Sequence, residues 1–224
     1  AIDSLKKDPT SRRCVIQMWD PEIDYDGDGK DYPCNLSVTV QVESGRLVMT
    51  VFNRSNDIVF GMLGANAAHF SVLQEYIARA LKLPMGHLTQ VSSNAHVYVD
   101  RHRALMESML TARHSHYDGG ATVDHTAFGL LMNEGDEMEF ACLPLVDLDD
   151  VSEWDVNVAR LLETLSPRTF MSSSHFLELT AAPMLAAHDE FKRGNRAEAL
   201  SLCSRINAPD WRLACEEWVE RRMK

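Results

Sequence analysis

The amino-acid sequence predicts an α/β (α+β) fold, in which a mixed β-sheet is covered by helices and followed by an α-helical C-terminal extension. Two neighbouring segments, 36–42 and 46–53, alternate apolar and polar residues as strands do. Residues 66–82 carry apolar side chains at helical spacing, and from about residue 151 onward the pattern is helical. Because strands precede helices, we expect a main α/β domain at 1–150 and a helical extension at 151–224.

The first elements follow from local patterns. Residues 1–7 are typical of the end of a helix, and the turn-forming residues 8–11 separate it from a strand at 14–19. Residues 24–32 are too polar and too rich in glycine for regular structure, which predicts a surface loop. Glu43-Ser44-Gly45 then joins the two alternating segments, and this arrangement predicts a β-hairpin.

A long amphipathic helix is expected next, ending before Pro84. Strand-like composition returns at 88–99, a helical pattern follows at 101–113, and a loop-rich region precedes a strand at 138–143. The helices expected in the C-terminal extension cover 154–165, 176–192, 195–206 and 209–222.

Composition and charge restrict the class of function. The chain has 33 acidic and 22 basic side chains, for a formal net charge of -11. A protein that binds a nucleic acid polymer usually presents a basic face to the phosphates, so we expect no such partner. A small anionic ligand remains possible, because a few arginines in one pocket can bind a phosphate.

Cysteine usage and hydropathy indicate a cytoplasmic protein. The five cysteines are odd in number and form no CxxC pair, as is typical of a reducing compartment. No segment reaches the roughly 20 consecutive apolar residues of a membrane helix, so we expect no membrane partner. The sequence shows no signal peptide, and it starts without methionine in helix-like sequence, so we expect residues to be missing upstream.

Several polar residues stand where a ligand could be bound. Arg12 and Arg13 lie in a turn before a strand, where guanidinium groups can form forked hydrogen bonds to phosphate. Cys34 follows a polar loop, where a neighbouring arginine would favour the thiolate. Each is also compatible with a plainer role, as a solvated strand start or a buried structural thiol.

A second group of polar residues follows the hairpin. The polar run 53–57 closes its second strand, and the Asn66 amide offers a donor and an acceptor, as the O4 and N3–H edge of uracil requires. A helix N-cap is the alternative role for Asn66. His96 and Tyr98 are expected on one side of a strand by its two-residue alternation, which suggests a ligand pocket.

The order and spacing of these residues resemble the thymidylate synthase family, including the related deoxynucleotide hydroxymethylases, over about residues 5–102. The matching positions are Lys6-Lys7-Asp8-Pro9-Thr10-Ser11-Arg12-Arg13, Trp19, Pro33-Cys34, Gly45-Arg46-Leu47, Arg54-Ser55-Asn56-Asp57, Gly61, Asn66, Gly86 and His96-Val97-Tyr98. This resemblance implies a thymidylate synthase-like sheet. It also implies that the chain is about the C-terminal two-thirds of such an enzyme, because the N-terminal third of the family pattern is absent.

The resemblance implies a catalytic set of Cys34, Arg54 and Asn66. Cys34 would add to C6 of the pyrimidine, and C5 would then attack the methylene group carried by 5,10-methylenetetrahydrofolate. Arg54 and Ser55 match residues that hold the 5'-phosphate, and the arginine in the family also lies close to the cysteine sulfur. Asn66 matches the residue that reads the base.

The remaining matches concern the folate, the ribose and a second subunit. Asp57 matches a residue on the folate side, and His96 with Tyr98 match residues near the ribose 3'-hydroxyl. Arg12 and Arg13 match a pair that reaches across a dimer interface to the partner's phosphate, so a homodimer is implied. The family requires no metal.

Departures from the family pattern leave alternatives open. Asn35 stands where histidine is usual, and one residue is inserted between Asp57 and Asn66. Residues 218–224 do not resemble the apolar tail that closes over the folate in the family. A site open to water favours 5-hydroxymethyl-dUMP as product, because water can capture the transferred one-carbon group. A sealed site favours dTMP. Asparagine at 66 favours dUMP, with dCMP as the alternative substrate. The family's catalytic glutamate belongs to the N-terminal third that is absent from this sequence. The alternative function is therefore an inactive module that binds a nucleotide or another protein.

Three further patterns suggest other roles. The acidic run 24–29 resembles the start of a calcium loop, but Asn35 occupies the twelfth position, where glutamate is expected. A histidine-rich and aspartate-rich stretch could hold a metal, although a solvated loop explains it as well: His114, His116, Asp118, Asp124 and His125. Trp211 and Trp218, seven residues apart, could bind a partner or belong to a core.

Overall fold

The computed structural model describes residues 1–25, 32–107, 144–164 and 167–222. The chain divides into two compact units, Ala1–Ala121 and Thr122–Lys224. The division falls within a stretch that the structure does not describe, so a domain boundary near residue 150 stays a prediction.

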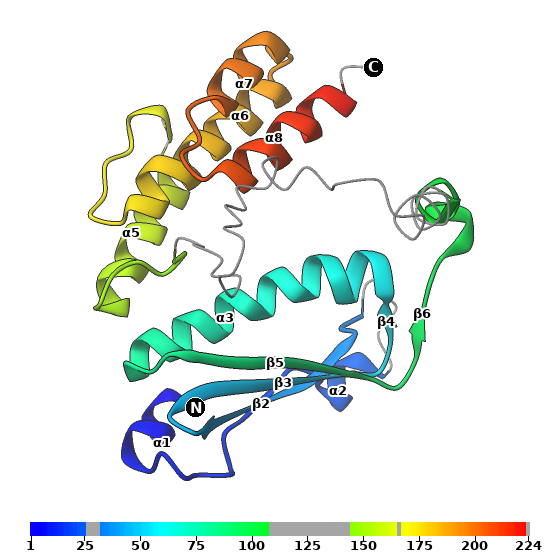
Figure 1. Ribbon diagram of the computed structural model, residues 1–224, viewed down its shortest axis with the longest axis vertical. Helices are drawn as coiled ribbons and strands as arrows, with labels where there is room; N and C mark the ends of the chain where they lie inside the picture. Colours follow the sequence, from blue (N-terminus) through cyan, green and yellow to red (C-terminus); the bar gives the residue numbers. More distant parts are fainter. Residues whose placement is uncertain (26–31, 108–143, 165–166, 223–224) are drawn as a thin grey trace, which may run out of the picture. The chain divides into compact units, whose positions relative to one another are not determined.

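The first unit contains a four-stranded mixed sheet, in agreement with the predicted fold class. Its strands lie in the order β1 (Val15–Gln17), β2 (Asn35–Glu43), β3 (Arg46–Asn53) and β5 (Met85–Ser92). The first three are antiparallel neighbours, whereas β5 runs parallel to β3. Figure 1 shows helix α3 (Asn66–Leu81) lying along this sheet, and it supplies the crossover between the two parallel strands.

The predicted hairpin is confirmed. Glu43 pairs with Arg46, so the connection has two residues. Ser44 and Gly45 both have positive φ, 51° and 75°. Positive φ at both positions is the requirement of the type I′ turn, whose twist matches that of the flanking strands.

The core of the first unit lies between α3 and one face of the sheet. Inward side chains of β2 and β3 are fully buried and meet Phe70, Ile77 and Ala78 of α3. Leu5 of α1 (Ile2–Lys7) joins the same cluster. Helix α3 ends at Lys82, which adopts the left-handed conformation, so the predicted helix over 66–82 is confirmed.

One buried polar side chain stabilises the parallel pairing. The register of β3 and β5 shifts between Leu47 and Met49. Gln74 of α3 is only 3% exposed, and its Nε2 donates to the carbonyls of Leu47 (2.8 Å), Gly86 (3.2 Å) and His87 (3.2 Å). The amide thus binds backbone acceptors of both strands where the register of their pairing shifts.

The predicted strand at 88–99 is wrong in its extent. Two strands replace it, because the chain leaves the main sheet after Ser92 and forms β6 (Ala95–His96), which pairs in parallel with β4 (Asn56–Asp57). The backbone N–H of Asn56 donates to Asn94 O at 2.9 Å and fixes this second pairing. Residues 99–107 are helical, so the helix begins earlier than expected.

Two further short elements of the first unit were not predicted. Helix α2 (Pro21–Asp24) is capped by the Asp20 side chain, which accepts from Glu22 N, and it begins with proline. A π-helical segment, η1 (Ile58–Ala65), precedes α3, and its last hydrogen bond runs from Asn66 N to Gly61 O. A π-turn accommodates one extra residue in a helix, as the insertion expected between Asp57 and Asn66 would require.

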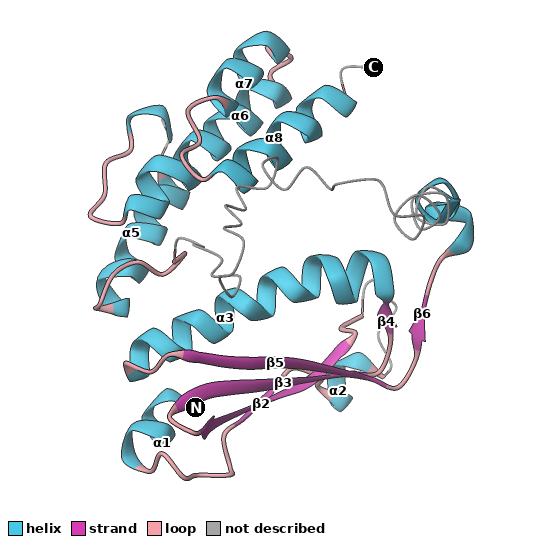
Figure 2. Cartoon of the chain, in the orientation of Figure 1, coloured by secondary structure: helices cyan, strands magenta, loops and turns pink. Residues whose placement is uncertain are grey.

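The described residues of the second unit form helices and loops without a strand (Figure 2). The predicted helices are confirmed, with a π-turn at the start of the second: α5 (Val151–Glu163), η4 (Leu177–Ala181) with α6 (Ala182–Lys192), α7 (Arg196–Cys203) and α8 (Pro209–Arg221). Trp211 and Trp218 pack against a buried cluster of this unit, which supports a role in its core. None of the described helices combines the length and apolar character that a membrane crossing requires.

Candidate active site

The Cys34 thiol is exposed at the entrance to β2. The preceding residues are held by Arg54, which follows β3: its Nε donates to Pro33 O at 3.0 Å, and one terminal nitrogen lies 3.5 Å from Tyr32 O. The backbone N–H of Arg54 also donates to Cys34 O at 3.0 Å. The structure therefore brings the predicted nucleophile and the predicted phosphate ligand into one local assembly.

An aromatic ring supports the same arginine. The guanidinium carbon of Arg54 lies 5.3 Å from the centre of the Trp19 ring, within the range of a cation–π contact. Ser55 follows directly, and its hydroxyl makes no hydrogen bond to any residue that the structure describes. The positive charge of Arg54 and the hydroxyl of Ser55 thus belong to adjacent residues, and both groups are suited to binding a phosphate group.

Asp57 lies in β4 opposite His96 of β6. Its carboxylate accepts hydrogen bonds of 3.3 Å from the backbone N–H groups of Val59 and Phe60 and contacts His102 Nε2 at 3.3 Å. Burial raises the pKa of Asp57, but these hydrogen bonds outweigh it and the net shift is downward. The carboxylate is therefore kept ionised as a hydrogen-bond acceptor.

His96 and Tyr98 meet as expected, although the strand ends between them. Their ring centres are 4.9 Å apart at an interplanar angle of 88°. Arg101 lies with its guanidinium carbon 5.2 Å from the centre of the Tyr98 ring. Tyr98 is 49% exposed, so about half of this side chain remains accessible to solvent.

Asn66 begins α3 next to the end of β3. Its Nδ2 donates to Asn56 Oδ1 at 3.1 Å. The Asn56 amide in turn donates to Gln90 Oε1 and to Ser92 Oγ, each at 3.2 Å. The side chain of Asn66 is thus fixed by a buried polar network and does not act as an N-cap, since α3 has Ala65 at that position.

A second branch of this hydrogen-bond network reaches Asn35, the residue that follows Cys34. Asn35 Nδ2 donates to Asn53 Oδ1 at 2.6 Å, and Asn53 Nδ2 lies 3.5 Å from Ser92 Oγ. Asn53 is 1% exposed. The segments that carry Cys34 and Asn66 are therefore connected through side-chain amides at one end of the sheet.

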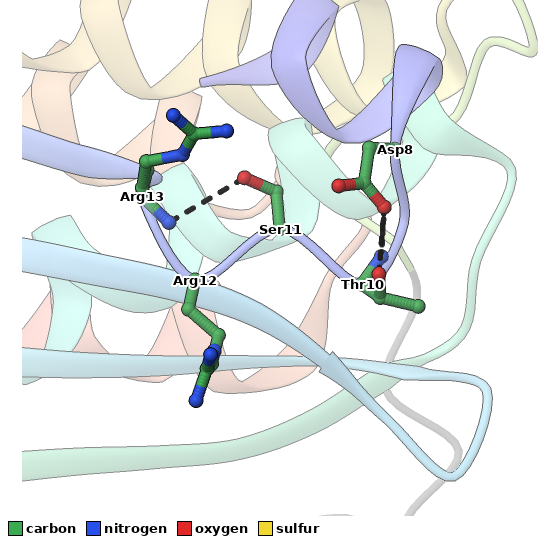
Figure 3. Close-up of a pocket in the computed structure, with 5 residues that line it drawn as sticks. All are labelled: Asp8, Thr10, Ser11, Arg12 and Arg13. Carbon is green, nitrogen blue, oxygen red and sulfur yellow. Dashed lines mark hydrogen bonds between the residues drawn. The ribbon is translucent and has the colours of Figure 1, made fainter.

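Arg12 and Arg13 lie elsewhere on the first unit. They border an open pocket of about 840 Å³ with Asp8, Thr10 and Ser11, in which Asp8 accepts from Thr10 N and Oγ1. Figure 3 shows the two arginine side chains extending in opposite directions from the loop.

The strand register separates these arginines from Cys34. Val15 pairs with Thr39 and Gln17 with Ser37, so residues before Val15 lie toward the far end of β2 from Asn35. Roughly six residues of strand, or about 20 Å, intervene. Within one chain, the arginine pair is not brought together with the cysteine.

Sequence reasoning missed His102, Gln90 and the role of Asn56. His102 lies one helical turn after Tyr98, and this spacing is the signal that could have placed it near the site. The described residues contain no group of three metal-ligating side chains. The acidic run 24–29 lies mostly outside the described residues, and the histidine-rich and aspartate-rich stretch 114–125 lies wholly outside them.

A thymidylate synthase family model matches residues 1–118. The deoxyuridylate hydroxymethyltransferase of Pseudomonas phage M6 is 36% identical over 226 residues, which cover 99% of this chain and 61% of that protein. The putative thymidylate synthase of Methanothermobacter marburgensis is 38% identical over 98 residues, 44% of this chain and 43% of the relative. The chain thus spans less than two thirds of the length of these relatives.

A structural comparison gives a partial match. Thermostable thymidylate synthase A from Bacillus subtilis covers 47% of this chain and 37% of its own, with 30% sequence identity and a TM-score of 0.42. The family model, by contrast, covers more than half of the chain and includes every predicted site residue. The chain belongs to the thymidylate synthase family.

Proposed function

We propose that this chain carries the nucleophile and the nucleotide site of an enzyme that transfers a one-carbon unit to C5 of dUMP, with 5,10-methylenetetrahydrofolate as donor. Cys34 adds to C6, and the electron pair released at C5 attacks the methylene carbon. The observation that carries the proposal is the exposed Cys34 thiol, which directly follows two residues hydrogen-bonded by the Arg54 guanidinium.

The other site residues support defined roles in this reaction. Arg54 and Ser55 bind the 5'-phosphate, and Asn66 reads the base. His96 and Tyr98 bind the ribose. Asp57 contributes an ionised acceptor for the folate, in agreement with the downward shift of its pKa. We propose that the protein acts in the cytoplasm, as its odd number of cysteines without a CxxC pair indicates.

We propose hydroxymethylation over methylation. Support comes from the phage M6 relative, which matches 99% of this chain and is named a deoxyuridylate hydroxymethyltransferase. In that route C5 gives up its proton and the folate leaves as an amine, which takes up a proton. Water then adds its hydroxyl group to the exocyclic methylene carbon and releases its other proton, and Cys34 departs from C6 as the thiolate.

Mass analysis of the nucleotide tests the reaction. The full-length natural protein is incubated with dUMP and 5,10-methylenetetrahydrofolate, and the nucleotide is expected to gain CH2O. A gain of CH2 would instead show dTMP formation, and a Cys34→Ser variant should yield neither product. Nucleotide binding without any change in mass would favour the inactive binding module.

We further propose a homodimer that forms through the sheet face opposite α3. Support comes from a row of side chains across that face, where Val15 pairs with Thr39 and Thr39 with Thr50. Val15 and Val91 on this sheet are 53% and 46% exposed. Exposed apolar side chains on a sheet face are typical of subunit interfaces.

Subunit mixing tests the dimer and the role of the distant arginines together. A Cys34→Ser chain and an Arg12→Ala/Arg13→Ala chain are each expected to be inactive. An equal mixture should recover roughly a quarter of the wild-type activity, because half of the dimers are mixed and each has one complete site. If mixing restores no activity although the mixed dimer is detected, Arg12 and Arg13 do not act on the partner.

A further inference from the structure

Three side-chain amides form a directional relay that ends at Asn66. Gln90 Nε2 donates to the main-chain carbonyl of Met62 at 2.8 Å. Asn56 Nδ2 donates to Gln90 Oε1 at 3.2 Å, and Asn66 Nδ2 donates to Asn56 Oδ1 at 3.1 Å. The hydrogen bonds thus run in one direction, from Asn66 to Asn56, from Asn56 to Gln90, and from Gln90 to the Met62 carbonyl.

The direction of this relay is fixed by its first acceptor. A carbonyl oxygen cannot donate a hydrogen bond, so Gln90 must present its NH2 group to Met62 and its oxygen to Asn56. Asn56 is then held with its NH2 toward Gln90 and its oxygen toward Asn66. Because Asn56 is only 2% exposed, water cannot readily replace a lost partner.

The local backbone is adapted to this arrangement. The N–H of Asn66 bonds to Gly61 O, five residues back, whereas a regular α-helix would direct it to Met62 O. The Met62 carbonyl instead accepts the Gln90 amide. A Cβ atom on Gly61 would lie 2.4 Å from Asn56 Oδ1, so only glycine leaves room for the relay's central acceptor.

The fixed direction of the relay determines which way the side-chain amide of Asn66 faces a pyrimidine base. A freely rotating amide can pair with uracil, which offers N3–H and O4, or turn over and pair with cytosine, which offers N3 and the 4-amino group. Turning over would place Asn66 Oδ1 against Asn56 Oδ1, two acceptors in contact. The relay therefore holds the Asn66 oxygen where it can accept N3–H of uracil.

We propose that Gln90 and Asn56 are positioning residues that lock the amide orientation of Asn66 and so select uracil over cytosine nucleotides. This inference rests on the proposed function, in which Asn66 reads the base. Neither residue touches the nucleotide; both act through the polarity that they impose on Asn66.

Equilibrium binding of dUMP and dCMP to the full-length natural protein tests the relay. The wild type should prefer dUMP. Gln90→Met keeps the size of the side chain but frees Asn56 to turn, and it should lower the ratio of the two affinities by about tenfold, equivalent to about 1.4 kcal/mol. The control is Gln17→Met, which removes an exposed amide-to-carbonyl hydrogen bond of the same length, 2.8 Å to Trp19 O, and should leave the ratio unchanged.

A second variant keeps the test decisive if Gln90→Met does not fold. Asn56→Leu removes the acceptor toward Asn66 and should lose the preference for dUMP. An unchanged affinity ratio in both Gln90→Met and Asn56→Leu overturns the relay and leaves the proposed function intact. Absence of binding of either nucleotide to the wild type overturns both.

Discussion

Replacement of Arg54 by lysine separates the charge of this residue from its geometry. Lysine keeps a positive charge for the phosphate but cannot reproduce the Nε bond to Pro33 O at 3.0 Å or the stacking over Trp19. A hydrogen bond from a charged donor contributes about 1.5 kcal/mol or more, and a partly exposed cation–π contact about 0.5 kcal/mol. The contact to Tyr32 O, at 3.5 Å, adds little. We therefore expect Arg54→Lys to lower the free energy of unfolding by about 2 kcal/mol.

Urea unfolding followed by circular dichroism measures this loss, and hydrogen exchange of peptides covering 32–36 locates it. Arg46→Lys is the matched control, because Arg46 also donates to a carbonyl, Met85 O at 3.1 Å, but from an exposed position. It should change the free energy of unfolding by less than about 0.5 kcal/mol. Equal stability of the two variants, with unchanged exchange at 32–36, would refute the view that the guanidinium holds the Cys34 loop.

Three further predictions concern other parts of the structure. Gln74→Met should lower the free energy of unfolding, measured by urea denaturation, by about 2–4 kcal/mol. The reason is that it removes the side-chain donor to the carbonyls of Leu47, Gly86 and His87. A loss below about 0.5 kcal/mol would contradict this prediction. Asp57 has a lowered pKa in the folded state, so its contribution to stability is present above the pKa of the unfolded chain and is lost as the pH falls through the folded value. Asp57→Asn should accordingly destabilise the protein more at pH 7 than at pH 3, and equal effects at both would exclude this linkage. Among the four described cysteines, exposed Cys34 should react with iodoacetamide first, since Cys14 is buried and burial raises the pKa of Cys215 and that of Cys203 to about 11. At pH 8 the thiolate fraction of Cys203 should be about 100-fold below that of an ordinary cysteine, as peptide mass spectrometry of labelling rates can show.

Local patterns were sufficient to predict the regular elements. The two-residue alternation of 36–42 and 46–53 and the turn between them predicted the hairpin, because strand periodicity and turn chemistry depend on neighbouring residues. The apolar spacing of 66–82 predicted α3 for the same reason. The strand at 88–99 was wrong because pairing of Asn56 with residues near 94 decided where the chain leaves the sheet.

The sequence by itself determined the fold class, the family and the residue types available for chemistry. Only the tertiary structure decided what these residues contact. It connected Arg54 to the loop before Cys34, across more than 20 positions, and it ordered Gln90, Asn56 and Asn66 into a relay with one direction. An amide has no preferred orientation in the sequence, because its two ends are nearly equal in shape; the orientation arises only when the fold places one end against a carbonyl that must accept.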